Sequence, residues 1–322
     1  MIYIAEIGNN HNGNIELAKK MADAAISSGS DYVKFQVYNI DKFINRASVY
    51  YKDFLTERLS FDAFKELKKH VELNKGRFLA TPFDEDSLML LHEMGLGTIK
   101  ISSGDVNNKQ LIGRAIDLGK NLIISVGGAT LKEIDEMVNF LEKSTAKFSI
   151  LHCIIDYPAK FQELNLNFIT TLKKRYSCPV GYSDHSPGIE ASLAAIALGA
   201  EIVEKHFTID RTLPGGDNQM SVLPDEFKRL RREGSHIEEA LGSLERKISK
   251  DELEVKKLIR RKFVAKRDIL RNSPIGDEDL LLLRTSDPDA GFEAGSYAGL
   301  ISKRALRDIK RGELITKELI GG

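Results

Sequence analysis

The sequence predicts an α/β protein, a (β/α)8 barrel followed by a small β-rich domain. The barrel prediction rests on three features of the first 245 residues. Short apolar runs alternate there with amphipathic helical patterns. Eight such pairs fit within about 240 residues, which matches a closed barrel better than an open doubly wound sheet. The runs are also apolar throughout, as expected of parallel strands that helices cover from outside.

Eight apolar runs are predicted to form the barrel strands. In chain order they are residues 2–5, 31–37, 77–81, 98–102, 121–126 and 147–153, a seventh that begins at Val180, and residues 200–206. Thr130-Leu131-Lys132-Glu133 matches a helix capping box. Ser186-Pro187 is interpreted as a cap with proline at the first helical position. The last barrel helix is expected to begin at Pro224 and to bury Leu241.

The character of the chain changes after Gly242. Residues 246–262 are rich in charge and are predicted to be an exposed connector. The helical periodicity is then lost, and Arg267-Asp268-Ile269 recurs about forty residues later as Arg307-Asp308-Ile309. This internal echo predicts two related hairpin-like units in a small β-rich domain at residues 263–322.

The bulk properties narrow the function classes. Hydrophobic residues make up 42% of the chain, charged residues 29%, and the formal net charge is zero, so nothing global favours binding to nucleic acid or to an anionic membrane. Two cysteines are too few for a disulfide framework. We find no secretory leader and no apolar run of membrane-spanning length. A cytoplasmic enzyme that contacts neither nucleic acid nor membrane is therefore expected.

Polar residues gather at the predicted C-terminal ends of the barrel strands. In chain order they are Glu6, Lys34, Gln36, Thr81, Ser103, Asp105, His152, Ser183, Asp184, His185 and His206. In a barrel these ends converge on one mouth, which is where active sites of this fold lie. The sequence therefore predicts an active site at that rim.

Two histidines are candidates to hold a metal. His185 and His206 follow neighbouring predicted strands, so their imidazoles are expected within reach of one divalent ion. A single histidine at a strand end is more often a hydrogen-bonded structural residue. For His152 the structural and the functional interpretations both stay open.

Lys34 lies between two apolar residues, where burying its charge is costly unless it meets an anion. That anion is either a ligand or an internal partner such as Glu6. Thr81, Ser103 and Ser183 are small hydroxyl donors suited to phosphate oxygens beside such a lysine, and each could equally be a strand-end cap.

At this point the residues resemble a known family. The motifs that carry the resemblance are Ala5-Glu6-Ile7-Gly8-Asn9-Asn10-His11-Asn12-Gly13, Val33-Lys34-Phe35-Gln36, Thr81-Pro82-Phe83, Lys100-Ile101-Ser102-Ser103-Gly104, Leu151-His152-Cys153, Tyr157-Pro158, Gly181-Tyr182-Ser183-Asp184-His185 and Glu204-Lys205-His206-Phe207-Thr208. Together they resemble the bacterial sialic acid synthases, which make N-acetylneuraminate and related nonulosonic acids such as legionaminate and pseudaminate. The C-terminal segment resembles the family's antifreeze-like (SAF) domain, a β-clip fold.

The resemblance implies a reaction and an assembly. The family condenses phosphoenolpyruvate with an N-acetylated amino sugar, here N-acetylmannosamine or a dideoxy analogue. The products are a nine-carbon 2-keto acid and phosphate, which is released by C–O cleavage. The family fold, a barrel followed by a SAF domain, assembles as a domain-swapped homodimer in which each SAF domain caps the partner's barrel.

The resemblance also implies roles for individual residues. The divalent ion, Mn²⁺ first and Mg²⁺ or Co²⁺ as alternatives, would be held by His185 and His206. The groups that bind phosphoenolpyruvate would be Lys34, Thr81, Ser103 and Ser183. Glu6 would act as an acid/base or orienting group. The groups that line the sugar site would be Gln36, Asp105, Tyr157 and Asp217, with Arg284 entering from the other subunit.

Several positions depart from the family pattern. Ile155 replaces a polar residue that contacts phosphoenolpyruvate, and Asp105 replaces a glutamate. The other positions that differ from the usual residues are Ile124-Ser125-Val126-Gly127-Gly128, Asn218 and Arg284-Thr285-Ser286-Asp287. Two rival hypotheses therefore stay open: another phosphoenolpyruvate-condensing 3-deoxy-aldulosonate synthase, and a non-catalytic descendant that binds a sugar. Ile155 is the feature that favours the second rival.

Overall fold

The computed structural model describes residues 1–285, 287 and 289–321. Ser286, which belongs to one of the departures named above, lies outside the described residues, as do Pro288 and Gly322. The chain divides into two compact units, Met1–Gly242 and Ser243–Gly322.

The first unit is built around eight parallel strands. They are β1 (Ile2–Gly8), β2 (Tyr32–Val37), β3 (Phe78–Pro82), β4 (Thr98–Ile101), β5 (Asn121–Ser125), β6 (Phe148–Cys153), β7 (Val180–Asp184) and β8 (Ile202–His206). They follow one another in the order β3-β2-β1-β8-β7-β6-β5-β4, and β3 and β4 also lie in contact, so the sheet curls into a barrel. The predicted (β/α)8 fold is confirmed.

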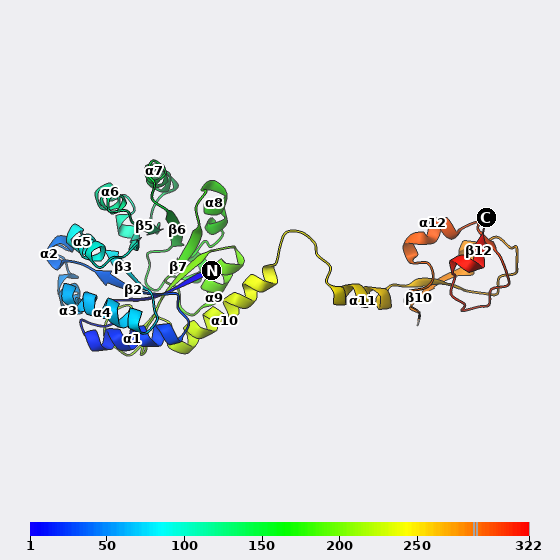
Figure 1. Cartoon of the computed structure of the whole chain (residues 1–322), viewed down its shortest axis with the longest axis horizontal. Coiled ribbons are helices and arrows are strands. Elements are labelled where there is room, and N and C mark those ends of the chain that lie inside the picture. The colour runs from blue at the N-terminus through cyan, green and yellow to red at the C-terminus, as the bar shows by residue number, and fades with distance from the viewer. Residues whose placement is uncertain (286, 288, 322) are drawn as a thin grey trace. The chain divides into compact units, whose positions relative to one another are not determined.

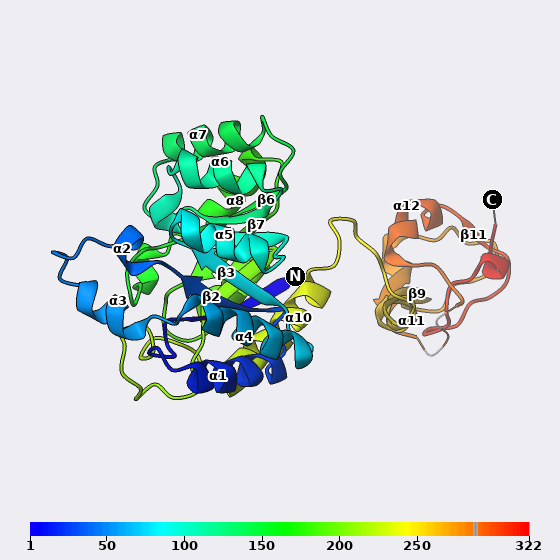
Figure 2. The ribbon, with the colours of Figure 1, turned by 60° about the vertical axis from the view of Figure 1, so that its left-hand side comes forward.

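Helices surround the strands on the outside of the barrel (Figure 1). They are α1 (Ile15–Ser27), α2 (Ile40–Phe43), α3 (Tyr51–Glu57), α4 (Phe61–Leu73), α5 (Glu85–Glu93), α6 (Lys109–Asp117), α7 (Leu131–Leu141), α8 (Phe168–Arg175), α9 (Glu190–Ala197) and α10 (Pro224–Leu241). Figure 2 shows the short helices α2 and α3 projecting to one side of the barrel, in the connection between β2 and α4.

Local sequence signals explain most helix starts, and two of our expectations were wrong. The predicted capping box at Thr130 is present at the start of α7. Ser186 does not cap α9, which begins at Glu190, because the Asp184 carboxylate accepts both the amide and the hydroxyl of Ser186. Leu241 is 53% exposed, since the packing of α10 on the barrel core ends one turn earlier at Ile237.

The inside of the barrel is layered because side chains alternate along each strand. An apolar layer is formed by Ile4, Leu79, Ile123, Leu151 and Ile202. Two residues further along the same strands come Glu6, Thr81, Ser125, Cys153 and Glu204, all buried. A layer of mostly polar side chains therefore lines the bottom of the barrel mouth, and an apolar layer fills the barrel below it. The intervening side chains face outward into the main core.

The second unit is small and β-rich. Its elements are α11 (Lys250–Ile259), α12 (Tyr297–Leu300) and the strands β9 (Lys262–Ala265), β10 (Leu280–Leu283), β11 (Arg304–Ala305) and β12 (Ile320–Gly321), with short 3-10 turns between them. Strands β9 and β10 pair antiparallel, as do β11 and β12. The segment that we expected to be the connector contains α11.

The internal echo corresponds to a reciprocal pairing. Asp268 accepts the amide of Arg311 and Asp308 accepts the amide of Arg271, both at 2.8 Å. Ile269 and Ile309 exchange two backbone hydrogen bonds across the same contact. The two similar segments thus pair with each other. Across the whole described chain, none of the helices is long and apolar enough to cross a membrane.

Candidate active site

The strand register brings together predicted residues from the ends of four neighbouring strands, β3, β2, β1 and β8. On β1, Glu6 is paired with Lys34 of β2 on one side and with His206 of β8 on the other. Gln36 of β2 is paired with Thr81 of β3. These five side chains come from adjacent strands at the same end of the barrel.

Lys34 is buried in a cluster of opposite charges. Its Nζ lies 3.0 Å from Oε2 of Glu6 and 3.5 Å from Oε2 of Glu204, and it donates a hydrogen bond to the Thr81 hydroxyl at 3.2 Å. Burial lowers the pKa of Lys34, but the two carboxylates outweigh it and the pKa is raised overall. Glu6 is therefore an internal anionic partner of Lys34, one of the two possibilities that the sequence allowed. A bound anion would meet a lysine that is already charged.

Two further charged groups complete the cluster, and our sequence reasoning did not assign them to the site. Lys100 lies 3.7 Å from Glu204 and donates to the Ser125 hydroxyl at 2.6 Å. Glu204 accepts a hydrogen bond from the Ser183 hydroxyl at 2.9 Å. Burial raises the pKa of Glu204, yet Lys100 and Lys34 outweigh this effect and lower it to about 2, so Glu204 is a carboxylate.

A signal for these two groups is present in the sequence. Lys100 stands between Ile99 and Ile101, the same arrangement that drew attention to Lys34. Glu204 lies two residues after an interior isoleucine, so strand alternation places it inside the barrel. Both residues also belong to the motifs that carry the family resemblance.

The two candidate metal ligands are neighbours. The ring centroids of His185 and His206 lie 5.4 Å apart. Nδ1 of His185 lies 2.6 Å from the carbonyl oxygen of Ile154. Because a carbonyl only accepts, Nδ1 carries the proton and Nε2 keeps its lone pair for a ligand. Burial, and then the neighbouring His206, lower the pKa of His185 to about 3, which favours the neutral, metal-binding form.

The donor set fits a divalent ion that takes its remaining ligands from water and substrate. Nδ1 of His206 is buried without a hydrogen-bond partner among the described residues. The same nitrogen lies 3.7 Å from Oδ2 of Asp217. In the described part of the chain, no group of three or more histidine, cysteine, aspartate or glutamate side chains is arranged to hold a metal. Two imidazoles would therefore be the ligands that the protein supplies to an open site. Imidazole nitrogen suits a first-row divalent metal, and the oxygen ligands from water and substrate suit Mn²⁺.

Three of the predicted sugar-site residues lie beside these groups. Gln36 donates to Oε1 of Glu6 at 3.3 Å. The Tyr157 ring is stacked on His185, with centroids 4.2 Å apart, and is half exposed. Asp217 faces His206, as described above. The three side chains border the same part of the mouth.

The remaining predicted residues are placed differently. Ser103 accepts the Gly127 amide at 3.0 Å and lies 3.3 Å from Sγ of Cys153. The Asp105 carboxylate is held in its own turn by Ser102 and Asn108, at 2.9 and 3.0 Å. Arg284 is exposed in the second unit, directly after β10.

His152 has a structural role. It is buried, and its Nε2 lies 2.7 Å from the carbonyl oxygen of Leu164. Its ring packs against Phe168 and Tyr182. These contacts hold the loop after β6 against the barrel. They explain the presence of a histidine here without a catalytic role.

Two departures from the family pattern are neighbours in space. A Cβ atom at Gly127 would lie 2.7 Å from Cγ2 of Ile155, and one at Gly128 would lie 2.6 Å from its Cδ1. The Ile155 side chain thus occupies the space above a turn that has no side chains. Ile155 itself is 54% exposed at the mouth.

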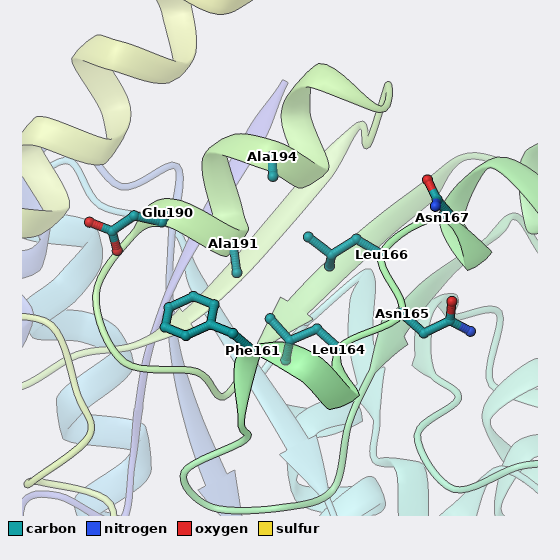
Figure 3. A pocket seen from close by; sticks show the side chains of 8 residues that line it. All are labelled: Phe161, Leu164, Asn165, Leu166, Asn167, Glu190, Ala191 and Ala194. Atoms are coloured by element: carbon teal, nitrogen blue, oxygen red, sulfur yellow. The ribbon is translucent and has the colours of Figure 1, made fainter.

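A separate surface pocket of about 420 Å³ lies between the loop that follows β6 and helix α9 (Figure 3). Its lining residues are Phe161, Leu164, Asn165, Leu166, Asn167, Glu190, Ala191 and Ala194. Glu190 is the only titratable side chain in this lining, and none of the predicted site residues belongs to it. The charged groups that suit chemistry are at the barrel mouth.

Comparison with known proteins gives concordant matches. A sequence model of the NeuB family matches residues 21–246. An N,N'-diacetyllegionaminic acid synthase of Campylobacter jejuni is 39% identical over 98% of both chains. A synthase of the same name from Legionella pneumophila is 34% identical over 98% of this chain and 94% of its own. Among solved structures, the chain is similar to the crystal structure of an N-acetylneuraminic acid (sialic acid) synthetase from Leptospira borgpetersenii in complex with citrate. The two are 38% identical and superpose with a TM-score of 0.77, and the match covers 80% of this chain and 90% of the other.

Proposed function

Since the chain belongs to the NeuB family, we propose that it is a nonulosonic acid synthase that condenses phosphoenolpyruvate with an N-acylated amino sugar. C3 of phosphoenolpyruvate forms a bond to the aldehyde carbon of the sugar, water adds to C2, and the C2–O bond breaks to release phosphate. The observation that carries the proposal is the buried lysine–carboxylate cluster beside two imidazoles at the barrel mouth.

The lysines account for binding of the donor. Phosphoenolpyruvate carries a carboxylate and a phosphate, and Lys34 and Lys100 place two amino groups in a region shielded from water, where an anion would favour their charged forms. The hydroxyls of Thr81, Ser103 and Ser183 would supply neutral hydrogen bonds to the same oxygens. Ile155 removes one donor on the phosphate side. The backbone amide of Gly127 would replace it only by giving up its hydrogen bond to the Ser103 hydroxyl.

The carboxylates account for proton handling. Oε2 of Glu6 is buried and has Lys34 as its close neighbour, while Oε1 accepts from Gln36. We assign Glu6 as the acid/base or orienting group for the oxygens of the sugar. Glu204 favours the charged form of both lysines; it helps to raise the pKa of Lys34, whereas burial still lowers the pKa of Lys100 overall.

His185 and His206 would hold the divalent ion, with Mn²⁺ the first candidate and Mg²⁺ or Co²⁺ the alternatives. When bound, such an ion polarises a carbonyl oxygen and lowers the pKa of bound water. Tyr157, Gln36 and Asp217 would line the space for the sugar beside the imidazoles. Asp105 belongs to this set only if its turn opens, since its carboxylate is engaged locally.

The acceptor is proposed from chemistry. Both relatives that we compare in sequence are named for N,N'-diacetyllegionaminic acid, a nine-carbon product. Phosphoenolpyruvate supplies three of those carbons, so both acetamido groups must already be on the six-carbon acceptor. A diacetamido hexose is therefore the first acceptor to test, ahead of N-acetylmannosamine.

The assembly and location are also proposals. The second unit would be a SAF domain that caps the barrel of a partner subunit in a domain-swapped homodimer, and Arg284 of the partner subunit would enter the sugar site. Phosphoenolpyruvate is a cytoplasmic metabolite, which supports a cytoplasmic enzyme.

The test is a panel of acceptors with phosphoenolpyruvate and Mn²⁺, with the condensed product detected by mass. We expect a product from at least one N-acylated amino sugar and none from phosphorylated aldoses. Phosphate release with a phosphorylated aldose alone would instead establish a 3-deoxy-aldulosonate synthase. Calorimetric titration with phosphoenolpyruvate tests the non-catalytic alternative that Ile155 favours, because an inactive sugar binder should show no Mn²⁺-dependent affinity for it.

A further inference from the structure

A second buried ion pair lies behind the mouth and takes no part in the chemistry described so far. Nζ of Lys205 is 3.0 Å from Oδ2 of Asp184, and the two side chains are 1% and 0% exposed. The residues are paired in the register of β7 and β8. Because side chains alternate along a strand, Lys205 faces outward while Glu204 and His206 face the mouth.

The pair is the centre of a closed hydrogen-bond network. Oδ1 of Asp184 accepts the amide and the hydroxyl of Ser186 at 2.8 and 2.7 Å, and Oδ2 accepts the hydroxyl of Ser192 in α9 at 2.6 Å. Lys205 donates to the carbonyl oxygen of Ser186. Two strand ends, the turn after β7 and helix α9 are thereby tied to one point.

Each candidate metal ligand adjoins a member of this network. His185 lies in the turn between Asp184 and Ser186, both of which are held by the network. His206 directly follows Lys205 at the end of β8. The same network of four side chains thus fixes the backbone position of both histidines. The hydrogen bond of His185 to the carbonyl oxygen of Ile154 fixes the orientation of the His185 ring.

Stability alone is a weak explanation for this arrangement. A buried ion pair contributes little net stability, because the loss of hydration offsets the attraction of the charges. What a fully satisfied network does provide is a single geometry, since any shift leaves a buried polar group unpaired. Groups that orient the ligands of a metal commonly tune its affinity in this way.

We propose that the Asp184–Lys205 pair is a positioning device that sets the separation of His185 and His206 and so the affinity of the site for a divalent ion. This inference rests on the proposed function, because it takes the two histidines as the metal ligands. Asp184 and Lys205 face away from the mouth, so neither would touch the ion or the reacting atoms.

The test measures Mn²⁺ affinity by electron paramagnetic resonance, without substrate, in Lys205→Met and Ser192→Ala. Thermal unfolding of the metal-free proteins reports on the fold. We expect Lys205→Met to bind Mn²⁺ about 10- to 100-fold more weakly than the wild type, the range typical of lost outer-layer partners. Ser192→Ala keeps the charges and should give a smaller loss of the same sign.

Lys120→Met is the matched control. Lys120 is another buried lysine, but it donates to the carbonyl oxygen of Leu96 at the opposite end of the barrel, just before β5. It should alter stability and leave Mn²⁺ affinity unchanged. If Lys205→Met does not fold, the double variant Asp184→Asn with Lys205→Met removes the unpaired charge and is measured instead.

The outcomes separate this proposal from the one on which it rests. Wild-type affinity in folded Lys205→Met, or an equal loss in Lys120→Met, overturns the positioning role while leaving the metal site intact. His185→Ala is measured alongside. If the wild type and His185→Ala bind Mn²⁺ equally, the histidine metal site itself is wrong and the positioning role is overturned with it.

Discussion

At the scale of single residues, Glu204 is the carboxylate that both buried lysines of the site share. It faces two lysines and a serine hydroxyl in a region that excludes water. Lys34 and Lys100 each stand alone among apolar strand residues, and Glu204 lies two residues after Ile202, so the sequence holds a signal for all three members of this cluster. The pairing of these charges is not readable from the sequence, because which lysine meets which carboxylate depends on the register between strands.

Glu204→Gln should destabilise the protein strongly. The amide keeps the shape and a hydrogen-bonding oxygen for Ser183, but it leaves Lys34 and Lys100 with one carboxylate fewer. We expect a loss of about 3–5 kcal/mol in the free energy of unfolding, as for breaking a buried ion pair. Urea unfolding measures it.

The control is Glu201→Gln, three residues earlier. That side chain is 53% exposed and pairs with Lys173 at 3.4 Å, so its loss should change stability by less than about 1 kcal/mol. Equal losses in the two variants would mean that Glu204 is not the shared partner of the lysines.

Glu57, the last residue of α3, predicts a pH effect. Burial, then the nearby charges of Asp217 and Asp53, raise its pKa to about 7. The unfolded chain releases this proton near pH 4.3, so the raised pKa makes the folded state less stable as pH rises from about 4.3 to 7. Glu57→Gln removes that loss. The melting temperature of the variant minus that of the wild type should therefore increase from pH 5 to pH 8. The same difference in melting temperature at both pH values would contradict the raised pKa.

At the scale of elements, strands were easier to predict than the connections between them. All eight barrel strands were anticipated, because a buried parallel strand is a continuous apolar run. The start of α9 was not, because Ser186 is equally suited to cap a helix or to close a turn on Asp184, and only the position of that carboxylate decides. The contact between Ile155 and the Gly127-Gly128 turn joins two connections from different strands, so no local pattern reveals it.

That contact predicts an energetic coupling. Gly128→Ala places a methyl group 2.6 Å from Cδ1 of Ile155, at a position with φ +71°. The backbone conformation alone should cost about 1–2 kcal/mol, and the overlap should add about 1–3 kcal/mol.

In an Ile155→Ala background, only the backbone part should remain. A double-mutant cycle on the free energy of unfolding measures the difference. Additive effects of the two substitutions would show that Ile155 does not fill the space above the turn.

At the scale of the whole molecule, composition marks the change at Gly242, and the structure divides the chain at the same residue. The helix α11 in the expected connector was missed because charged residues suit an exposed helix as well as a flexible segment. The two echo segments are recognisable from the sequence, but their pairing with each other is not, because similar segments need not lie side by side. How subunits assemble stays a prediction from the family resemblance.

The swapped homodimer predicts complementation between two inactive variants. Arg284→Ala lacks the arginine, and His206→Ala lacks a metal ligand. In a mixed dimer that exchanges its second domains, one barrel would have both an intact metal site and the arginine from its partner. Unfolding and refolding the variants together should restore about a quarter of wild-type activity, if subunits pair at random.

Light scattering supplies the second readout for the assembly, with an expected mass of twice the 36.0 kDa of the chain. No recovery of activity in mixtures of confirmed dimers would show that Arg284 acts within its own subunit or not at all.

The most direct test of the synthase assignment follows the bridging oxygen of phosphoenolpyruvate. The enzyme is supplied with Mn²⁺, an accepted amino sugar and phosphoenolpyruvate labelled with ¹⁸O between C2 and phosphorus, and both products are weighed by mass spectrometry. We predict a nine-carbon 2-keto acid and phosphate that retains the label, with neither formed by His206→Ala. Unlabelled phosphate, or phosphate released without any condensed product, would contradict the assignment.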